Sequence, residues 1–121
     1  MFDFQNLEVY KKAKAFHVLC REFLSTHRQE AYIKDQLSRA SFSIPLNIAE
    51  GSGKFSKADR RKYFVTARGS VFECIAIIDI LAGFGKVTEE ELEILTRTAD
   101  ELSRMLYTMI RNLTDRKQSE V

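Results

Sequence analysis

The chain has no tryptophan, one proline and two cysteines, and it lacks any long hydrophobic run. A helix that crosses a membrane needs about 20 consecutive apolar residues, whereas the longest apolar stretch, from Cys74 to Ala82, is interrupted by Asp79. The N-terminal residues lack the basic start and apolar stretch of a secretion signal. Two cysteines are too few for a disulfide-rich scaffold, and both Cys20 and Cys74 fall on apolar helical positions. We therefore expect free, buried thiols in a cytoplasmic protein.

What the sequence does contain is the composition of an ordinary globular domain. Its 121 residues are 45% hydrophobic and 30% charged, which argues against intrinsic disorder and allows one hydrophobic core. The sequence shows no internal repeat, linker or low-complexity segment. We therefore expect residues 1–121 to form a single domain.

Apolar residues recur at helical spacing in four segments, and no segment alternates with the period of two that a strand would show. The four predicted helices cover about residues 6–26, 30–51, 56–83 and 88–113. Asn6 (or Asp3), Ser56 and Thr88 are predicted N-caps, and glycines at positions 51, 53, 83 and 85 predict helix ends. Four amphipathic helices joined by short loops predict an all-α fold, an antiparallel up-down-up-down four-helix bundle.

The single proline, Pro45, falls inside the second predicted helix. It removes the backbone donor that would bond the carbonyl oxygen of Ser41 and clashes with the preceding turn. We therefore expect this helix to be kinked, or to form a wide turn, near Pro45.

A row of polar residues is predicted beside the apolar face of helices two and three: Ser43, Asn47, Glu50, Ser70 and Glu73. One interpretation is a structural hydrogen-bond network, in which Asn47 and Glu50 pair with Ser70 or Arg68 or cap the backbone of a neighbouring subunit. The other makes Glu50 and Glu73 a carboxylate pair for acid–base chemistry or metal binding. Metal-binding bundles usually supply a Glu-x-x-His motif, and neither histidine here has a glutamate three residues before it. The structural network is the favoured interpretation.

Charge is distributed unevenly along the chain. Residues 34–68 contain eight basic and three acidic side chains, whereas residues 69–103 contain two basic and eight acidic ones. Such an asymmetry suggests an anionic partner for the basic part, or head-to-tail self-association.

The basic cluster comprises Lys54, Lys57, Arg60, Arg61, Lys62 and Arg68. It predicts a phosphate-binding surface for RNA or DNA. The alternative is a solvated helix start whose cations pair with the acidic half of the next subunit. The interleaved aromatic residues Phe55, Tyr63 and Phe64 are interpreted as core rather than as base-stacking platforms, since Tyr63, Phe64 and Ala67 fit the buried row.

Three motifs resemble those of the bacterial four-helix-bundle proteins known as rRNA-intervening-sequence proteins, some of which are encoded within insertions in the large ribosomal RNA gene. The motifs are Gln36-Leu37-x-Arg39-Ala40, Ser43-Ile44-Pro45-x-Asn47-Ile48-Ala49-Glu50-Gly51 and Ala67-Arg68-Gly69-Ser70-Val71-x-Glu73. The resemblance covers nearly the whole chain. It implies a four-helix bundle that assembles as a homopentamer. Relatives include the accessory protein of diversity-generating retroelements, a basic pentamer that binds nucleic acid and its reverse transcriptase.

The resulting hypothesis is a non-enzymatic, oligomeric accessory or scaffold module. Its basic cluster would contact RNA, DNA or a nucleic-acid enzyme such as a reverse transcriptase, and it would act without catalytic residue, metal or cofactor. The alternative is a purely structural or protein-binding homo-oligomer with no nucleic-acid role. An enzyme is the third option, and Glu50 with Glu73 would be its only reasonable residues.

Overall fold

The computed structural model describes residues 2–114, and within that range it contains helices and no strands. A short 3-10 helix comes first and four long α-helices follow: η1 (Asp3–Asn6), α1 (Glu8–Thr26), α2 (Ala31–Ser52), α3 (Lys57–Gly83) and α4 (Glu89–Asn112). Each α-helix begins and ends within two residues of its predicted bounds. The all-α prediction is confirmed.

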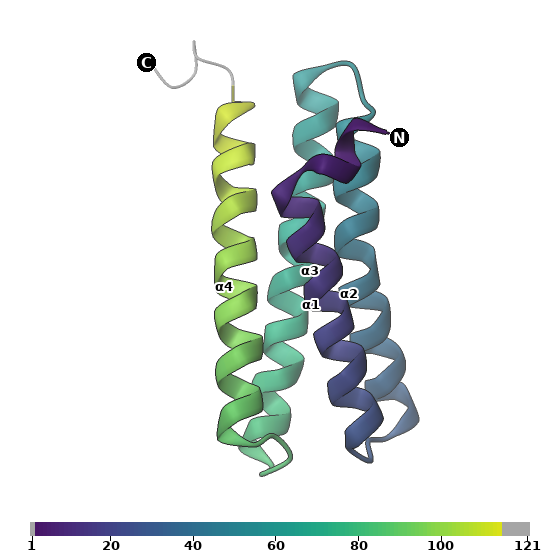
Figure 1. The fold of residues 1–121 in the computed structure, drawn as a ribbon, viewed down its shortest axis with the longest axis vertical. Helices are drawn as coiled ribbons and strands as arrows, with labels where there is room; N and C mark the ends of the chain where they lie inside the picture. Colours follow the sequence, from purple (N-terminus) through teal and green to yellow (C-terminus); the bar gives the residue numbers. More distant parts are fainter. Residues whose placement is uncertain (1, 115–121) are drawn as a thin grey trace.

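The four α-helices run alternately up and down along one common direction (Figure 1). α1 packs against α2 and α4, and α3 packs against α2 and α4, so each helix has two neighbours. The α1–α2 and α3–α4 connections lie at one end of the bundle. The α2–α3 connection lies at the other end, together with the start of the chain and the end of α4 (Figure 1). The predicted antiparallel bundle is therefore confirmed.

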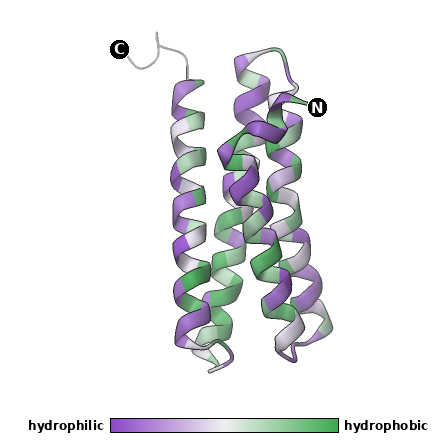
Figure 2. Cartoon of the chain, in the orientation of Figure 1, coloured by the Kyte–Doolittle hydropathy of each residue, from purple (hydrophilic) through white to green (hydrophobic). Residues whose placement is uncertain are grey.

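Each helix carries both hydrophobic and hydrophilic residues along its length (Figure 2), and the hydrophobic face points into one core. Phe16 of α1, Ile44 of α2 and Leu102 of α4 are almost completely buried, and each such side chain contributes about 1.5–3 kcal/mol to folding. Cys20 and Cys74 are free and buried, as predicted. The neighbouring Cys20 thiol and burial raise the pKa of the Cys74 thiol, so both cysteines act as small apolar core residues.

Side-chain caps explain two of the helix starts. Ser56 Oγ accepts the backbone N–H of the third residue of α3 at 3.1 Å. Thr88 and Glu91 form a reciprocal capping box at the start of α4, with N–O distances of 2.9 and 3.1 Å. The predicted N-cap at Asn6 is wrong, because Asn6 belongs to the 3-10 helix and the extended residue Leu7 precedes α1.

α2 ends at Ser52 with Gly53 as its C-cap, which confirms the predicted end at Gly51-Ser52-Gly53. Gly51 itself is still helical and is buried against α3. A Cβ atom at this position would lie 2.8 Å from Cε1 of Phe64. Gly51 therefore allows α2 and α3 to approach closely. Among residues 2–114, the left-handed conformation is adopted by Gly85, with φ of 72°, just after α3.

Pro45 is buried, and α2 remains α-helical on both sides of it. The expected kink at this position stays a prediction. Among residues 2–114, no helix has the length and apolar character needed to cross a membrane.

Candidate nucleic-acid and subunit interfaces

Five of the six predicted basic residues gather at one end of the bundle, which we call the basic end: Lys54, Lys57, Arg60, Arg61 and Lys62. They follow one another through the α2–α3 connection and the first turns of α3. All are exposed except Arg60, which is half-buried. Arg111, in the last turn of α4, lies at the same end (Figure 1). Sequence reasoning missed it because the basic cluster was sought along one stretch of the chain, although the predicted antiparallel bundle already brings the end of α4 to the α2–α3 connection.

The aromatic residues of the basic end differ in their surroundings. The Lys54 ammonium lies 5.1 Å from the centre of the Tyr63 ring, and Tyr63 is half-buried. Phe64 is 1% exposed and belongs to the core, as predicted. The interpretation of Phe55 as a core residue is wrong, because its side chain lies in the α2–α3 connection and is fully exposed at 104%. Phe55 is therefore the aromatic side chain of this end that presents its whole ring to solvent.

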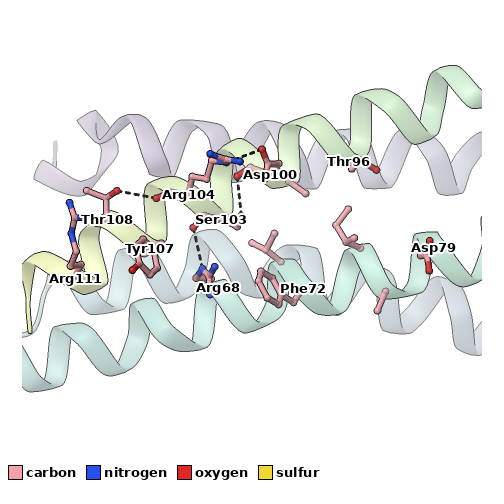
Figure 3. Close-up of a pocket in the computed structure, with 14 residues that line it drawn as sticks. Arg68, Phe72, Asp79, Thr96, Asp100, Ser103, Arg104, Tyr107, Thr108 and Arg111 are labelled. Atoms are coloured by element: carbon pink, nitrogen blue, oxygen red, sulfur yellow. Dashed lines mark hydrogen bonds and ion pairs between the residues drawn. The ribbon is translucent and has the colours of Figure 1, made fainter.

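Arg68 is not brought together with the other five basic residues. Its Nε–H donates to the backbone carbonyl oxygen of Ser103 at 3.2 Å. Its guanidinium carbon lies 4.6 Å from the ring centre of Phe72 and 5.5 Å from that of Tyr107, within the range of cation–π attraction. Arg68 therefore links α3 to α4 (Figure 3).

The predicted polar row forms a contact between α2 and α3. Ser43 Oγ lies 2.7 Å from Ser70 Oγ and 2.8 Å from the carbonyl oxygen of Ala40. Because a hydroxyl carries one hydrogen, Ser70 donates to Ser43 when Ser43 donates to Ala40. Asn47 turns back on its own helix, and its Nδ2 donates to the Ser43 carbonyl oxygen at 2.8 Å. Three of the five predicted residues thus join one local network.

Glu50 and Glu73 are outside that network. Both are exposed, and within residues 2–114 neither side chain makes a hydrogen bond or ion pair, so Glu50 does not pair with Ser70 or Arg68. The Ser43–Ser70 contact sets the register of antiparallel α2 and α3, which puts Glu50 and Glu73 at different heights along the bundle. They therefore do not form the carboxylate pair that an acid–base site would need. The same range contains no group of three histidine, cysteine, aspartate or glutamate residues that could hold a metal ion.

Two histidine contacts connect helices in ways the sequence did not indicate. His17 Nδ1 of α1 lies 2.7 Å from Oγ of the fully buried Ser41 in α2. Burial, with a further contribution from the positive charge of Arg21, lowers the pKa of His17. The Ser41 hydroxyl also donates to the Ser38 carbonyl oxygen at 3.3 Å, so both contacts satisfy this buried polar group.

His27, just after α1, pairs with Glu91 in the first turn of α4. Its Nε2 lies 2.5 Å from Glu91 Oε2, and each side chain is 26% exposed. Burial opposes the ionisation of Glu91, but hydrogen bonds from Thr88 and His27 outweigh it and lower the pKa of Glu91. The contact ties the end of α1 to the start of α4.

A groove of about 890 Å³ lies between α3 and α4 (Figure 3). Its lining is mainly apolar and includes Val71, Phe72 and Ile75. Polar residues stand along it, among them Asp79 and an Asp100–Arg104 ion pair with an N–O distance of 3.0 Å. A second hollow of about 370 Å³ shares Arg68, Phe72 and Tyr107 with it and extends to Gly69. We call the two together the α3–α4 groove.

Comparisons with known proteins agree with this architecture. The family model described as 23S rRNA-intervening sequence protein matches residues 5–108. A crystal structure from Bacteroides thetaiotaomicron is similar, with a TM-score of 0.78 and 25% sequence identity. It is described as a protein of unknown function from the S23 ribosomal protein family, and the match covers 84% of this chain and 97% of that one. A comparison with curated proteins found no match.

Proposed function

This chain belongs to the 23S rRNA-intervening sequence protein family, and from that premise we propose that it is a non-enzymatic accessory or scaffold module that assembles with copies of itself. The assembly acts in the cytoplasm and contacts RNA or DNA, alone or together with a nucleic-acid enzyme such as a reverse transcriptase. The contact is made through the basic end.

The observation that carries this proposal is the separation of charge between the two ends of the bundle. Lys54, Lys57 and Arg61 are exposed around the α2–α3 connection, whereas the acidic first turn of α4 lies at the opposite end (Figure 1). A concentrated positive surface attracts the phosphate backbone, and binding releases condensed counterions. The bundle therefore meets a polyanion with one end in preference to the other.

Self-assembly would multiply this effect. The family resemblance suggests a ring of five, and in such a ring the basic ends of all copies face the same way when the helices run parallel to the ring axis. Once one subunit has bound a nucleic-acid strand, the phosphate contacts of the other subunits with the same strand become intramolecular, and the overall affinity rises. No dedicated base-reading motif is needed.

The experiment is light scattering behind size exclusion at low and at high salt, with and without a mixed pool of RNA. We expect an oligomer that shifts with RNA at low salt only. A double charge reversal, Arg60→Glu with Arg61→Glu, should weaken RNA binding and flatten its salt dependence. The matched control is Lys86→Glu, an exposed cation near the other end, which should leave binding nearly unchanged. An oligomer that ignores RNA at every salt concentration would overturn the nucleic-acid role.

A second candidate is a purely structural or protein-binding homo-oligomer. It is favoured by the position of Arg68, which is already engaged within the chain by the Ser103 carbonyl oxygen and two aromatic rings. Under this alternative the remaining cations pair with acidic residues of a neighbouring subunit. A partner complex that survives high salt would favour it, because phosphate contacts weaken steeply with salt.

A further inference from the structure

Two different apolar surfaces lie on opposite sides of the bundle. On the α3–α4 side, Val65, Phe72 and Tyr107 are 44%, 55% and 53% exposed. On the α1–α2 side, Phe42 and Leu46 are 51% and 47% exposed. Because each helix contacts only its two neighbours, these two sides face away from each other. Contiguous apolar surface on a soluble domain usually marks a contact with another molecule.

The α1–α2 surface is defined by its contacts. The His17 ring of α1 lies against Phe42 of α2, with ring centroids 5.4 Å apart, so Phe42 stands where the two helices meet. Leu46 follows one helical turn later on the outer side of α2. We call Phe42 and Leu46 of α2, with the exposed Val18 of α1, the α1–α2 face.

Gly69 leaves open space beside the α3–α4 groove. It lies in the middle of α3, where glycine destabilises a helix relative to alanine. Gly51 has a reason within the chain, since a Cβ there would meet Phe64 at 2.8 Å, whereas a Cβ at Gly69 would meet nothing within 4 Å. Gly69 also borders the hollow that Val65 and Phe72 line. A missing side chain at this point lets a second surface approach the α3 backbone closely.

The two surfaces lie at the same height along the bundle. The contact between Ser43 and Ser70 aligns antiparallel α2 and α3, so residues 42–46 of α2 lie level with residues 67–71 of α3. Gly69 is therefore level with the middle of the segment from Phe42 to Leu46. In a closed ring there is no rise from one subunit to the next. Surfaces at equal height can meet when the bundles stand parallel to the ring axis.

One pair of opposite charges lies beside the two surfaces. Arg21 follows His17 by one turn on α1 and is exposed, and Asp79 stands exposed in the α3–α4 groove. Within residues 2–114 neither forms an ion pair. The contacts of His17 with Ser41 and of Ser43 with Ser70 place Arg21 about one turn from the height of Asp79. The long arginine side chain can span such an offset.

We propose that the α3–α4 groove of one copy receives the α1–α2 face of a second copy, head to tail, with Phe42 and Leu46 packed over Gly69. Because the two surfaces are unlike, each copy offers one of each, and repetition closes into a ring when the rotation between neighbouring copies is a whole fraction of a turn. This inference rests on the self-association in the proposed function and names the surfaces that carry it.

The first test is Gly69→Leu, with Gly83→Leu as the matched control. Both glycines lie in α3, and an added Cβ meets nothing within 4 Å at either position. Both variants should therefore fold with an unchanged or higher melting temperature. We expect Gly69→Leu to elute as a monomer of 14.0 kDa, and Gly83→Leu to assemble like the unmodified chain. A folded Gly69→Leu variant that assembles normally would overturn the proposal.

The second test mixes two variants, each with one blocked surface. Gly69→Leu blocks the groove and Phe42→Arg blocks the α1–α2 face, so each should be monomeric alone. Mixed in equal amounts, they should form a 1:1 pair and nothing larger, because one groove and one face remain intact between them. A mixture that stays monomeric would refute this pairing of surfaces.

The outcomes also separate this inference from the proposed function. An unmodified chain that is monomeric by light scattering would overturn both the self-association and the interface. An unmodified chain that assembles while Gly69→Leu has no effect would overturn the interface alone. RNA binding at low salt is measured independently in each variant, and its loss in a folded monomer supports a multivalent contact.

Discussion

The Nε–H of Arg68 donates a hydrogen bond to the backbone carbonyl oxygen of Ser103, 3.2 Å away, across the line where α3 and α4 meet. In the sequence, Arg68 belongs to the basic cluster. In the structure it is half-buried and connects α3 to α4. Its guanidinium also lies near the rings of Phe72 and Tyr107. One side chain thus supplies polar and apolar contact at the floor of the α3–α4 groove.

Replacement of Arg68 should therefore destabilise the fold. Arg68→Ala removes a charged hydrogen bond and two cation–π contacts, and we expect a loss of about 1.5–3 kcal/mol in the free energy of unfolding. Urea denaturation measures this loss. The control is Arg61→Ala, an exposed cation of the same helix, which should change stability by less than about 0.5 kcal/mol. Equal effects from the two variants would contradict the role assigned to Arg68.

The contact between Ser43 and Ser70 makes a prediction about coupling. Ser70→Ala leaves the Ser43 hydroxyl without its cross-helix partner and should cost about 1 kcal/mol. The double variant Ser43→Ala with Ser70→Ala removes both hydroxyls, so its loss should be smaller than the sum of the two single losses. A double-mutant cycle by urea denaturation measures the difference. Strict additivity would show that the 2.7 Å contact contributes nothing to stability.

The contacts of Glu91 predict that the free energy of unfolding depends on pH in the acidic range. The pKa of Glu91 is lowered from its ordinary value of 4.5 in the folded chain, so its contribution to stability is fully present above pH 4.5. It is lost as the pH falls below that value and through the lower folded pKa. Glu91→Gln should therefore reduce stability at neutral pH and lose less stability than the unmodified chain on acidification. Thermal melts between pH 7 and pH 3 measure this, and parallel curves for the two proteins would refute it.

The exposed ring of Phe55 predicts a preference for unpaired nucleotides. Stacking of a base on an aromatic side chain contributes about 1–3 kcal/mol, so Phe55→Ala should lower the affinity for single-stranded RNA at least about fivefold. Its stability should not change, since the ring is fully exposed. Fluorescence anisotropy with single-stranded and duplex oligonucleotides of equal length provides the measurement. Phe84→Ala, an exposed phenylalanine at the other end, is the control and should have no effect on either ligand.

The four helices themselves could be predicted from the sequence because their signals are local. The spacing of apolar residues, the Thr88–Glu91 capping box and the glycines around residues 83–85 act within a few residues of the backbone they shape. The same holds for the buried cysteines, which simply follow the apolar face of their helices. The predicted N-cap at Asn6 was wrong, because residues Asp3–Asn6 form a 3-10 helix before α1.

What the sequence by itself determined is thus the set of helices, their order and which face of each is buried. Only the tertiary structure decided which side chains meet between helices, because that depends on the rotation and height of each helix against its neighbours. It turned Asn47 back onto its own helix, placed Arg68 on the Ser103 carbonyl oxygen, and left Glu50 in solvent. It also gave two helical glycines different surroundings, since Phe64 packs against Gly51 whereas open space lies beside Gly69.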